Sequence, residues 1–417
     1  MNVVILDGDV SYPPTSGKRL RSLHLMLGLA SRHHITYIAR GNGDSIANEK
    51  AREYLEGKGI DARIIDAPIA RKKGVGFYAR LLGNLFAGTP YSVTSHFSEV
   101  VRSAVHEFAA KNPVDLWQVE WSGYLYALQG LGQPLHEMPI VMQAHNVDAL
   151  IWQRYHEAER NFLKRWYIAE QWRKFHRFEA DAFRAVRRVV AVSAEDAALA
   201  RRWYGIDNVD VVDNGVDVSY FCNVRPRDGS RAILYLGALD WRPNLDALDL
   251  LLGEIFPNVH RRLPDARLVI VGRNPPARLR QRVEAMPGVE LHADVPDVRP
   301  FMESSAVMAV PLRIGGGSRL KILEALAAGL PVVSTRIGAE GLAIRPGQDF
   351  TLADTAGDMA DRLVECLSTP APYRRQAQEG RGIVASRYDW STLSDRLERV
   401  WERAVAVAPT PSEGRGP

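Results

Sequence analysis

The chain has 417 residues, more than one ordinary hydrophobic core accommodates, so two domains of about 100–200 residues each are expected. Hydrophobic residues make up 46% and charged residues 24%, which excludes a disordered or fibrous protein. The formal net charge of +4 is only mildly basic, and it leaves room for local positive patches that bind phosphates or anionic membranes.

The two cysteines, Cys222 and Cys366, lie far apart without metal-ligand spacing, so we expect neither a disulfide framework nor a zinc site. The first residues, MNVVILDGDV, have a strand pattern and lack the basic and apolar regions of a secretory signal. No stretch approaches the ~18 apolar residues of a membrane-spanning helix. We therefore expect a cytoplasmic protein.

The first half of the chain alternates strand and helix patterns. Residues 2–7 (NVVILD) predict a buried strand, and residues 16–32 predict a helix with an apolar stripe. A second strand at 34–40, a helix at 46–55 and a third strand at 62–68 follow. Three later hydrophobic runs predict further strands: DLWQVE, PIVMQAH and RRVVAVS. This alternation is typical of βαβ units and a parallel sheet.

The second half repeats the pattern with five strand candidates: RAILYLG, ARLVIVG, VELHAD, AVMAVPL and PVVST. An Asn-Gly turn at 214–215 and the linker-like run NVRPRDGSR separate the two halves. We therefore predict two doubly wound α/β domains, residues 1–215 and 226–387, and a final helix at 388–407 that returns to the first domain. The tail, residues 408–417, has no apolar periodicity and is expected to be disordered.

The stretch RIGGGSRLKILEALAAGLPVVST, residues 313–335, favours an anion-binding site. Gly315, Gly316 and Gly317 follow a predicted strand at the sheet edge where ligands bind, and glycines let a backbone approach a phosphate closely. Ser318 is expected to cap the helix that follows, and a helix N-terminus attracts anions.

Three charged residues lie near the start of this helix. Arg319 and Lys321 add positive charge for a diphosphate, and Glu324 is suited to accept hydrogen bonds from the vicinal hydroxyls of a ribose. On an ordinary helix the same Lys–Glu spacing is a solvated surface pair. Combined with the triple glycine and the strand edge, the pattern predicts nucleotide binding.

Other phosphate and metal motifs fit less well. SYPPTSGKR lacks the first glycine and the final Ser or Thr of a Walker A loop, and IGGGSR lacks the third glycine of a dinucleotide fingerprint. Asp7-Gly8-Asp9 has the spacing of a metal-binding carboxylate pair, but strand-end turns use the same residues. We expect no metal there.

The run PLRIGGGSRLKILEALAAGLPVVSTRIGAEGL resembles the donor-binding signature of GT-B glycosyltransferases of the retaining family 4 type. The segments AHNVDALIWQR, VVAVSAEDA, DNGVDVSYF and YLGALDWRPNLDALDLL occur in the family's order. YPPTSGKRLRSLHLMLGLA resembles the family's acceptor loop and first helix, and SRYDWSTL resembles its closing helix. The resemblance covers about residues 1–405 and is most specific at 308–341.

The chain departs from the family pattern at two positions. Family members often carry two glutamates in this motif; here Gly316 replaces the first, and Glu324 is the second. Ala238 stands where the family usually has a diphosphate-binding arginine, and only Arg242 is nearby. The chain resembles a subgroup with the motif GGGxRLKxLEA, in which cations on the helix take over the diphosphate.

The resemblance implies a GT-B fold, with two Rossmann-like domains facing a central cleft and a C-terminal helix crossing back to the first domain. It implies transfer of a sugar from a UDP-, GDP- or other nucleotide-diphosphate sugar to a glycan or lipid-linked acceptor. Retention of configuration and a role in cell-surface polysaccharide or glycoconjugate synthesis are also implied. Neither a metal nor another cofactor is expected.

The resemblance further implies roles for individual residues. At the diphosphate we expect the side chains of Arg319, Lys321 and Arg242 and the backbone of Gly315, Gly316, Gly317 and Ser318. For the rest of the donor we expect Glu324 at the ribose, Val295 at the base, and His145 at the donor sugar or reacting centre. Gly17 and Lys18 are expected at the acceptor, and Glu340 at either substrate.

Several alternatives stay open. The basic and aromatic segments 71–88 and 152–178 fit either peripheral contact with the inner face of an anionic membrane or ordinary inward packing, and no RNA-binding motif supports nucleic acid. A nucleotide-sugar epimerase or hydrolase of this fold would need extra carboxylates near His145. A non-catalytic partner of another transferase would explain Gly316 and Ala238, but the presence of Glu324, Arg319, Lys321 and His145 together argues against it. A dinucleotide oxidoreductase is disfavoured, because Arg40 ends the strand that should end in an acidic residue.

Overall fold

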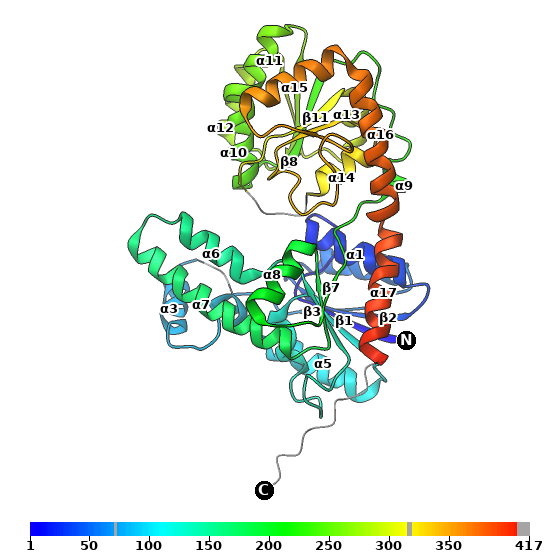
Figure 1. Cartoon of the computed structure of the whole chain (residues 1–417). Coiled ribbons are helices and arrows are strands. Elements are labelled where there is room, and N and C mark those ends of the chain that lie inside the picture. Colours follow the sequence, from blue (N-terminus) through cyan, green and yellow to red (C-terminus); the bar gives the residue numbers. More distant parts are fainter. Residues whose placement is uncertain (71–72, 315–318, 407–417) are drawn as a thin grey trace. The chain divides into compact units, whose positions relative to one another are not determined.

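A computed structural model of the protein describes residues 1–70, 73–314 and 319–406. The chain divides into two compact units (Figure 1): unit 1 comprises Met1–Asp213 and Leu393–Pro417, and unit 2 comprises Asn214–Thr392. The sequence analysis placed the domain boundaries at residues 215, 226 and 388. The tail predicted to be disordered, residues 408–417, lies outside the described residues.

Unit 1 is built on a seven-stranded sheet in the order β3-β2-β1-β4-β5-β6-β7, and every described pairing is parallel. The strands are β1 (Asn2–Asp7), β2 (His34–Gly41), β3 (Asp61–Asp66), β4 (Leu116–Val119), β5 (Ile140–Ala144), β6 (Arg188–Ala191) and β7 (Val209–Val211). The strand order reverses between β1 and β4, and ligands of doubly wound sheets bind at the carboxyl ends of such strands.

Helices cover both faces of the unit 1 sheet, so β1 is buried on both sides and its sequence is a continuous hydrophobic run. Ser16 caps the first helix by accepting a hydrogen bond from the backbone N–H of Arg19. The helices are α1 (Gly17–Leu29), α2 (Ser45–Glu56), α3 (Val75–Asn84), α4 (Tyr91–His96), α5 (Glu99–Lys111), the 3-10 helix η1 (Ser122–Leu128), α6 (Asp148–Ala158), α7 (Phe162–Arg184) and α8 (Ala194–Tyr204).

Unit 2 has a six-stranded parallel sheet in the order β10-β9-β8-β11-β12-β13, which reverses between β8 and β11. Its strands are β8 (Ala232–Ala238), β9 (Arg267–Arg273), β10 (Val289–Ala293), β11 (Val307–Val310), β12 (Val332–Ser334) and β13 (Thr351–Leu352). Its helices are α9 (Val218–Phe221), α10 (Arg242–Leu250), the π-helical turn η2 (Leu251–Ile255), α11 (Phe256–Arg262), α12 (Ala277–Glu284), α13 (Arg299–Ser304), α14 (Leu320–Ala327), α15 (Ala356–Ser368) and α16 (Pro370–Arg387).

The last helix, α17 (Trp390–Ala406), belongs to unit 1 from Leu393 onward. Trp401 on this helix is fully buried, and its Nε1 donates to Gln118 Oε1 on β4 at 2.8 Å. The predicted architecture of two doubly wound α/β domains with a returning C-terminal helix is therefore confirmed. None of the described helices is both long and apolar enough to cross a membrane.

Candidate active site

The cations of the glycine-rich stretch lie in unit 2, beside the carboxyl end of β8. Lys321 Nζ on α14 donates to Asn244 Oδ1 at 3.0 Å, and Asn244 Nδ2 donates to the Ala238 carbonyl at 2.9 Å. The Lys321 amine also lies 4.9 Å from the centre of the Tyr235 ring. A Cβ at Gly237 would come within 2.9 Å of the Asn244 amide, so only glycine fits this strand end without displacing its neighbours.

Two α14 side chains have pKa values shifted to near neutrality. Burial, reinforced by the positive charge of Arg319 and opposed by Glu324, lowers the pKa of the Lys321 amine to about 7. Burial raises the pKa of the Glu324 carboxyl to about 7, against the opposing charge of Lys321. A bound diphosphate would favour the protonated amine, so an anionic ligand would strengthen the positive charge of this site.

Arg319, and not the predicted Ser318, occupies the N-cap position of α14, with a left-handed φ of 52°. This is a correction to the sequence analysis. Left-handed backbone costs a non-glycine residue about 1–2 kcal/mol, and such strain clusters at functional sites. The Arg319 side chain is buried, and its Nη2 donates to Glu340 Oε2 at 3.2 Å. The other predicted contacts, Gly315, Gly316, Gly317 and Ser318, lie outside the described residues.

The remaining predicted residues of unit 2 lie along the carboxyl edge of the same sheet. Arg242 is the exposed first residue of α10, two positions before Asn244. Val295 follows β10, the edge strand, and its half-buried side chain packs against the hydrophobic core. β10 lies three strands from β11, which is about 14 Å at ~4.8 Å per strand. The roles of Arg242 at the diphosphate and of Val295 at the base stay predictions.

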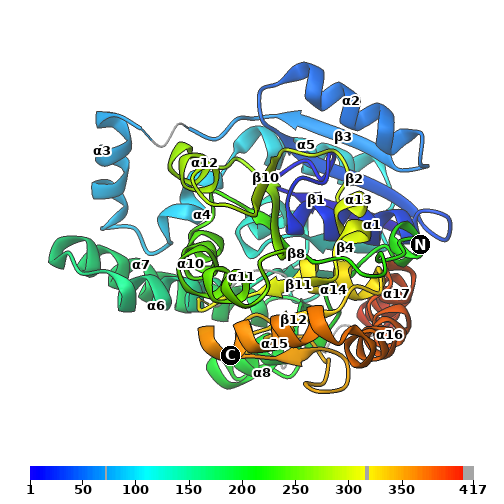
Figure 2. The same ribbon diagram turned by 90° about the horizontal axis from the view of Figure 1, so that it is seen from above.

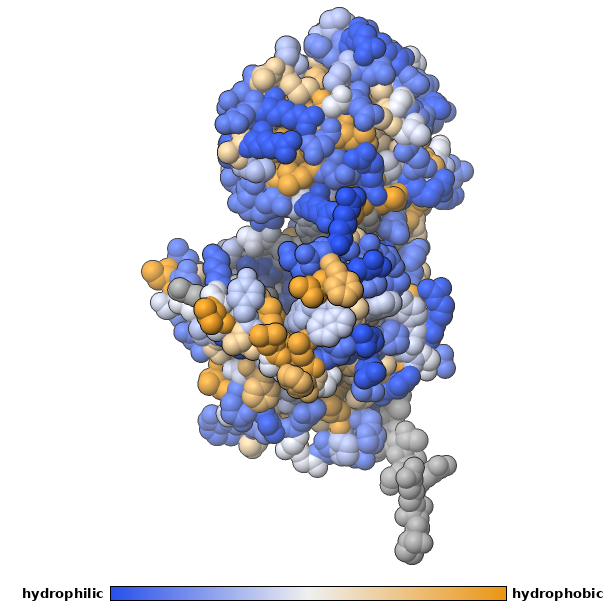
Figure 3. Space-filling model, turned by 90° about the vertical axis from the view of Figure 1, so that its left-hand side faces the viewer, coloured by the Kyte–Doolittle hydropathy of each residue, from blue (hydrophilic) through white to orange (hydrophobic). Residues whose placement is uncertain are grey.

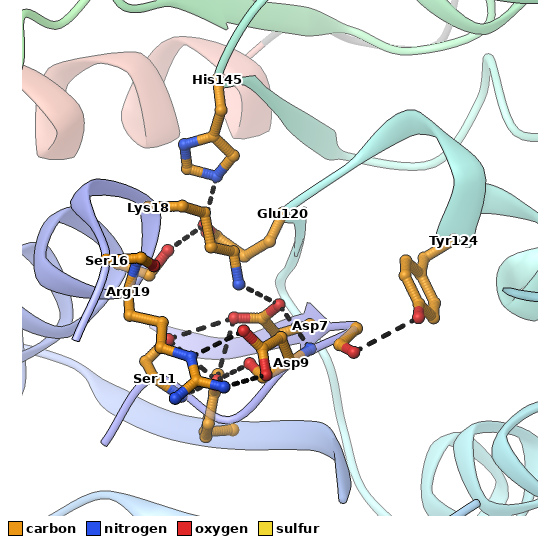
Figure 4. Close-up of polar contacts among 12 residues, drawn as sticks. Asp7, Asp9, Ser11, Ser16, Lys18, Arg19, Glu120, Tyr124 and His145 are labelled. Carbon is orange, nitrogen blue, oxygen red and sulfur yellow. Dashed lines mark hydrogen bonds and ion pairs between the residues drawn. The ribbon is translucent and has the colours of Figure 1, made fainter. Parts of the chain in front are cut away.

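In unit 1, chemically active side chains gather where neighbouring strands end (Figure 4). Asp7 ends β1, Glu120 directly follows β4, and His145 directly follows β5. The carboxyl ends of parallel strands share one edge of the sheet, and the topological reversal lies between β1 and β4. The sheet therefore brings together residues that are more than a hundred positions apart.

His145 lies against the buried carboxylate of Glu120, with Nε2 3.0 Å from Oε2. Glu120 also accepts hydrogen bonds from Ser22 Oγ at 2.5 Å and from Gln118 Nε2 at 2.6 Å. Although burial raises it, the contacts with His145, Lys18 and Ser22 lower the pKa of Glu120 to about 2. Burial lowers the pKa of His145 even though Glu120 opposes this shift. A neutral imidazole therefore faces a charged carboxylate at neutral pH.

Gly17 and Lys18 begin α1, next to the end of β1. The Lys18 amine forms an ion pair with Oδ1 of the buried Asp7, and Arg19 binds both carboxylate oxygens of Asp9 at 2.6 and 2.7 Å. Asp7 and Asp9 thus each bind a cationic side chain. Within the described ranges, no group of three or more His, Cys, Asp or Glu side chains is arranged to hold a metal ion.

Sequence reasoning missed two residues of these sites. Glu120 ends the run DLWQVE as His145 ends PIVMQAH, so the strand-end rule that selected His145 would also have selected Glu120. Asn244 has no comparable signal, because its contact with Lys321 arises only when α10 and α14 come together at the end of β8.

Two family models match the chain. Residues 21–220 match a model described as Glycosyltransferase Family 4. Residues 230–369 match a model described as Glycosyl transferases group 1. The first match lies almost entirely in unit 1 and the second lies in unit 2, and together they cover most of the chain.

Curated relatives include two enzymes of Mycobacterium tuberculosis. The chain is 31% identical over 221 residues to phosphatidyl-myo-inositol mannosyltransferase, covering 49% of this chain and 57% of that protein. It is 25% identical over 328 residues to glycogen synthase, covering 71% of this chain and 77% of that protein. The chain therefore spans little more than half the length of the mannosyltransferase.

Solved structures share the fold at low sequence identity. Sucrose-phosphate synthase from Thermosynechococcus elongatus aligns with a TM-score of 0.69 and 17% identity, over 97% of this chain and 100% of that one. HepE of Anabaena, solved with UDP and glucose, aligns with a TM-score of 0.64 and 14% identity, over 96% and 99% of the chains. These similarities confirm the predicted two-domain fold.

Proposed function

The chain belongs to the glycosyltransferases of the GT-B fold, and from this premise we propose that it transfers a sugar from a nucleotide-diphosphate sugar to a hydroxyl of a glycan or lipid-linked acceptor. In this reaction the bond between the anomeric carbon and the diphosphate oxygen breaks, and its electron pair leaves with the nucleoside diphosphate. The acceptor oxygen forms a new bond to the anomeric carbon, and the hydroxyl proton is released.

The observation that carries this proposal is the cationic start of α14. Lys321 and Arg319 lie where a glycine-rich segment follows β11, and Lys321 reaches the end of β8 through Asn244. Negative charge grows on the diphosphate as the glycosidic bond breaks, and fixed cations stabilise such charge best in a dry site. Glu324, one turn further along α14, is suited to accept hydrogen bonds from ribose hydroxyls.

We further propose retention of anomeric configuration and turnover without a metal ion. Retention is supported by the resemblance of PLRIGGGSRLKILEALAAGL to the retaining family 4 motif and to its GGGxRLKxLEA subgroup. Metal independence is supported by Arg319 and Lys321, which supply the positive charge that a divalent cation would otherwise supply. Proton NMR of the first product formed would show the anomeric configuration directly.

A role in cell-surface polysaccharide or glycoconjugate synthesis is supported by the names of the relatives, which include a mannosyltransferase of phosphatidyl-myo-inositol and a glycogen synthase. A lipid-linked acceptor would place the enzyme at a membrane. An exposed hydrophobic surface on unit 1 supports this proposal.

The α3–α7 surface combines exposed apolar residues with basic ones. In both ribbon views α3, α6 and α7 lie at one side of unit 1, and Figure 3 shows hydrophobic residues gathered on that side. Phe86 is 94% and Phe162 is 79% exposed. Lys174 Nζ on α7 donates to the Asn84 carbonyl at the end of α3 at 2.6 Å, which joins the two helices. The apolar members are Val75, Tyr78, Leu82, Phe86, Phe162, Leu163 and Trp166, and the neighbouring exposed cations are Lys73, Arg80, Arg160, Lys164 and Arg165.

The composition of the α3–α7 surface supports peripheral contact with an anionic bilayer. Exposed aromatic and aliphatic side chains enter the headgroup region, while basic side chains meet anionic lipids. The inward-packing alternative does not account for side chains as exposed as Phe86 and Phe162.

The donor site can be tested by calorimetry with UDP, GDP and ADP. We expect one nucleoside diphosphate to bind the parent protein, and Glu324→Ala to weaken its binding by about 1.5–3 kcal/mol because the ribose hydroxyls lose a charged acceptor. Glu284→Ala, an exposed change on α12 of the same unit, is the matched control and should bind normally. Equal affinity in folded Glu324→Ala would refute the ribose assignment, and no binding of any nucleotide by the parent would refute the proposed function.

A further inference from the structure

His145 lines a cavity of about 240 Å³ at the carboxyl ends of β1, β4 and β5. Its Nε2 lies 3.0 Å from Glu120 Oε2 (Figure 4), and within the described residues no protein group forms a hydrogen bond with its Nδ1. A neutral imidazole has one N–H donor and one acceptor nitrogen, and the hydrogen bond made by one nitrogen decides which of them carries the proton. The polarity of the contact with Glu120 therefore decides what His145 offers to a ligand.

A line of buried hydrogen bonds reaches Glu120 from the C-terminal helix. Trp401 Nε1 on α17 donates to Gln118 Oε1 at 2.8 Å, and Gln118 Nε2 donates to Glu120 Oε1 at 2.6 Å. The three side chains are at most 2% exposed. An indole N–H can only donate, so the Gln118 oxygen must face Trp401 and its NH₂ group must face Glu120. Trp401 thereby fixes the orientation of an amide that could otherwise lie either way round.

The second carboxylate oxygen of Glu120 faces His145. This oxygen also accepts from Ser22 Oγ at 2.5 Å, and the Glu120 backbone N–H donates to the Leu6 carbonyl of β1 at 2.9 Å, so the residue is held at both ends. Burial raises the pKa of Glu120, but the contacts with His145 and Lys18 lower it to about 2, so the carboxyl group is ionised. An ionised carboxylate can only accept, and the imidazole nitrogen that faces it must therefore carry the proton.

The charged groups around the imidazole keep it neutral. Burial lowers the pKa of His145, and the negative charge of Glu120 opposes this shift. The positive charges of Lys18 and Arg21 lower the pKa of His145 further, although Lys18 is itself paired with Asp7. At neutral pH the imidazole therefore has a single N–H, which lies at Nε2, and an unprotonated Nδ1.

We propose that the chain of hydrogen bonds from Trp401 holds His145 as the Nε2–H tautomer, with Nδ1 as the acceptor for a hydroxyl group of the substrate. Glu120 and Gln118 are then positioning residues, which act on the substrate only through the imidazole. A hydroxyl group can donate to Nδ1, whereas an ionised phosphate or carboxylate group has no proton to donate. The substrate hydroxyl rests on the proposed function; the tautomer does not.

Proton–nitrogen NMR of the full chain with ¹⁵N-labelled histidine measures the tautomer directly, because protonated and unprotonated ring nitrogens differ widely in chemical shift. His145→Gln identifies the signals of His145 by their loss. At neutral pH we expect a protonated Nε2 and an unprotonated Nδ1. A protonated Nδ1 beside an unprotonated Nε2, or a doubly protonated imidazole, would overturn the proposal.

Glu120→Gln reverses the polarity of the contact while keeping its shape. Trp401 still forces Gln118 to donate, so the amide oxygen of the new side chain must face Gln118 and its NH₂ group must face His145. We therefore expect the tautomer to change to Nδ1–H. Glu53→Gln, an exposed change on α2 of the same unit, is the matched control and should leave the tautomer at Nε2–H. An unchanged tautomer in folded Glu120→Gln would overturn the proposal.

Trp401→Phe tests the far end of the chain. Alone it should leave His145 as Nε2–H, because the carboxylate of Glu120 still only accepts. Combined with Glu120→Gln it frees the Gln118 amide to turn round, so a measurable fraction of the Nε2–H tautomer should return. The Nδ1–H tautomer alone in the folded double variant would contradict the role of Trp401. Thermal unfolding followed by circular dichroism shows whether each variant is folded.

Sugar transfer and nucleotide binding separate this inference from the proposed function. Glu120→Gln should lower kcat/KM by at least about tenfold, since a histidine held in the wrong tautomer loses its role. It should bind the nucleoside diphosphate as the parent does, because the residues proposed for the nucleotide belong to unit 2. Nucleotide binding together with the opposite tautomer in the parent would overturn this inference alone. The expected tautomers without nucleotide binding would overturn the proposed function alone.

Discussion

Lys321 and Glu324 lie one helical turn apart on α14, and both have pKa values of about 7. In the proposed donor site, Lys321 acts on the diphosphate in its protonated form, whereas Glu324 accepts the ribose hydroxyls in its ionised form. The fraction of donor-free protein in which both conditions hold is greatest near pH 7, and it falls on either side. We therefore expect these two residues of one helix to make the use of the donor depend on pH.

We expect kcat/KM to follow a bell-shaped pH profile centred near pH 7, since kcat/KM reports ionisations of the free enzyme. The acid limb belongs to Glu324, whose carboxylate is lost as pH falls through about 7, and the alkaline limb belongs to Lys321, whose charge is lost as pH rises through about 7. In Lys321→Arg the alkaline limb should disappear, because arginine stays protonated. An alkaline limb that persists in this variant would assign it to another group.

Lys321→Ala should lower kcat/KM by on the order of 10²–10³, comparable to removing one oxyanion donor, while binding of the intact donor falls much less. Charge on the diphosphate grows in the transition state, so the amine matters most there. Arg319→Ala should have a smaller effect because part of its charge is offset by Glu340. The double variant, with both Lys321→Ala and Arg319→Ala, should lose less kcat/KM than the product of the two single losses, since both cations share one diphosphate.

Steady-state kinetics of the single and double variants measure these losses. Arg278→Ala, an exposed change on α12, is the control for a lost positive charge in unit 2. Near-normal turnover by Lys321→Ala would contradict this role of Lys321 and would assign the stabilisation of the leaving group to Arg242 or Lys18.

The sequence predicted some of these residues and not others for physical reasons. Lys321, Glu324 and His145 were found because each has a local signal, a glycine-rich helix start or a strand end. The pairing of Lys321 with Asn244, and of His145 with Glu120, joins segments distant in sequence. Such contacts depend on strand order, which a single sequence does not reveal.

At the scale of elements, the strands inside continuous hydrophobic runs were predicted, and β7 and β13 were missed. β13 has only two residues, and the three residues of β7 (VDV) are interrupted by an aspartate, whereas the equally short β12 lies in the apolar run PVVST. α14 starts one residue later than a serine cap would predict, because Arg319 adopts left-handed backbone at that position.

The α3–α7 surface predicts sedimentation with anionic vesicles that weakens as salt is added, because the electrostatic part is screened. Replacing one deeply inserted side chain, as in Phe86→Ser, should lower partitioning by about tenfold, given the free energy of burying a phenylalanine. Ile46→Ser, at an exposed residue on α2, is the matched control. Equal partitioning onto neutral and anionic vesicles, or none onto either, would contradict contact with an anionic membrane. The α3–α7 surface would then have a different partner.

For the whole molecule, we expect turnover to change by no more than about twofold after treatment with EDTA, because side chains supply the positive charge at the diphosphate. Initial rates with and without added magnesium or manganese measure this. Loss of activity that either metal restores would require a metal site, and the carboxylates of Asp7 and Asp9 would then have to exchange their cationic partners for the ion.

The overall architecture was the most predictable level. Alternating strands and helices in two series predict two parallel sheets, and the long amphipathic pattern at the end predicts a returning helix. Strand order and the identity of the residues on either side of each reversal came only from the structure. The cavity at the carboxyl ends of β1, β4 and β5 is lined by residues from six separate segments of unit 1, so the sequence predicted it only in part, through Lys18 and His145.

The chain enters unit 2 at Asn214 and leaves it at Thr392, and these two ends are held together. Val216 pairs with Asp389 in a parallel bridge, and the Val216 N–H donates to the Tyr388 carbonyl at 2.8 Å. Unit 2 is thus an insertion whose entrance and exit are adjacent, the arrangement in which inserted domains are tolerated best. If unit 2 holds the donor, as proposed, we expect that replacing residues 214–392 by the corresponding unit of a related chain, through these two neighbouring junctions, changes donor preference without rebuilding the sheet of unit 1.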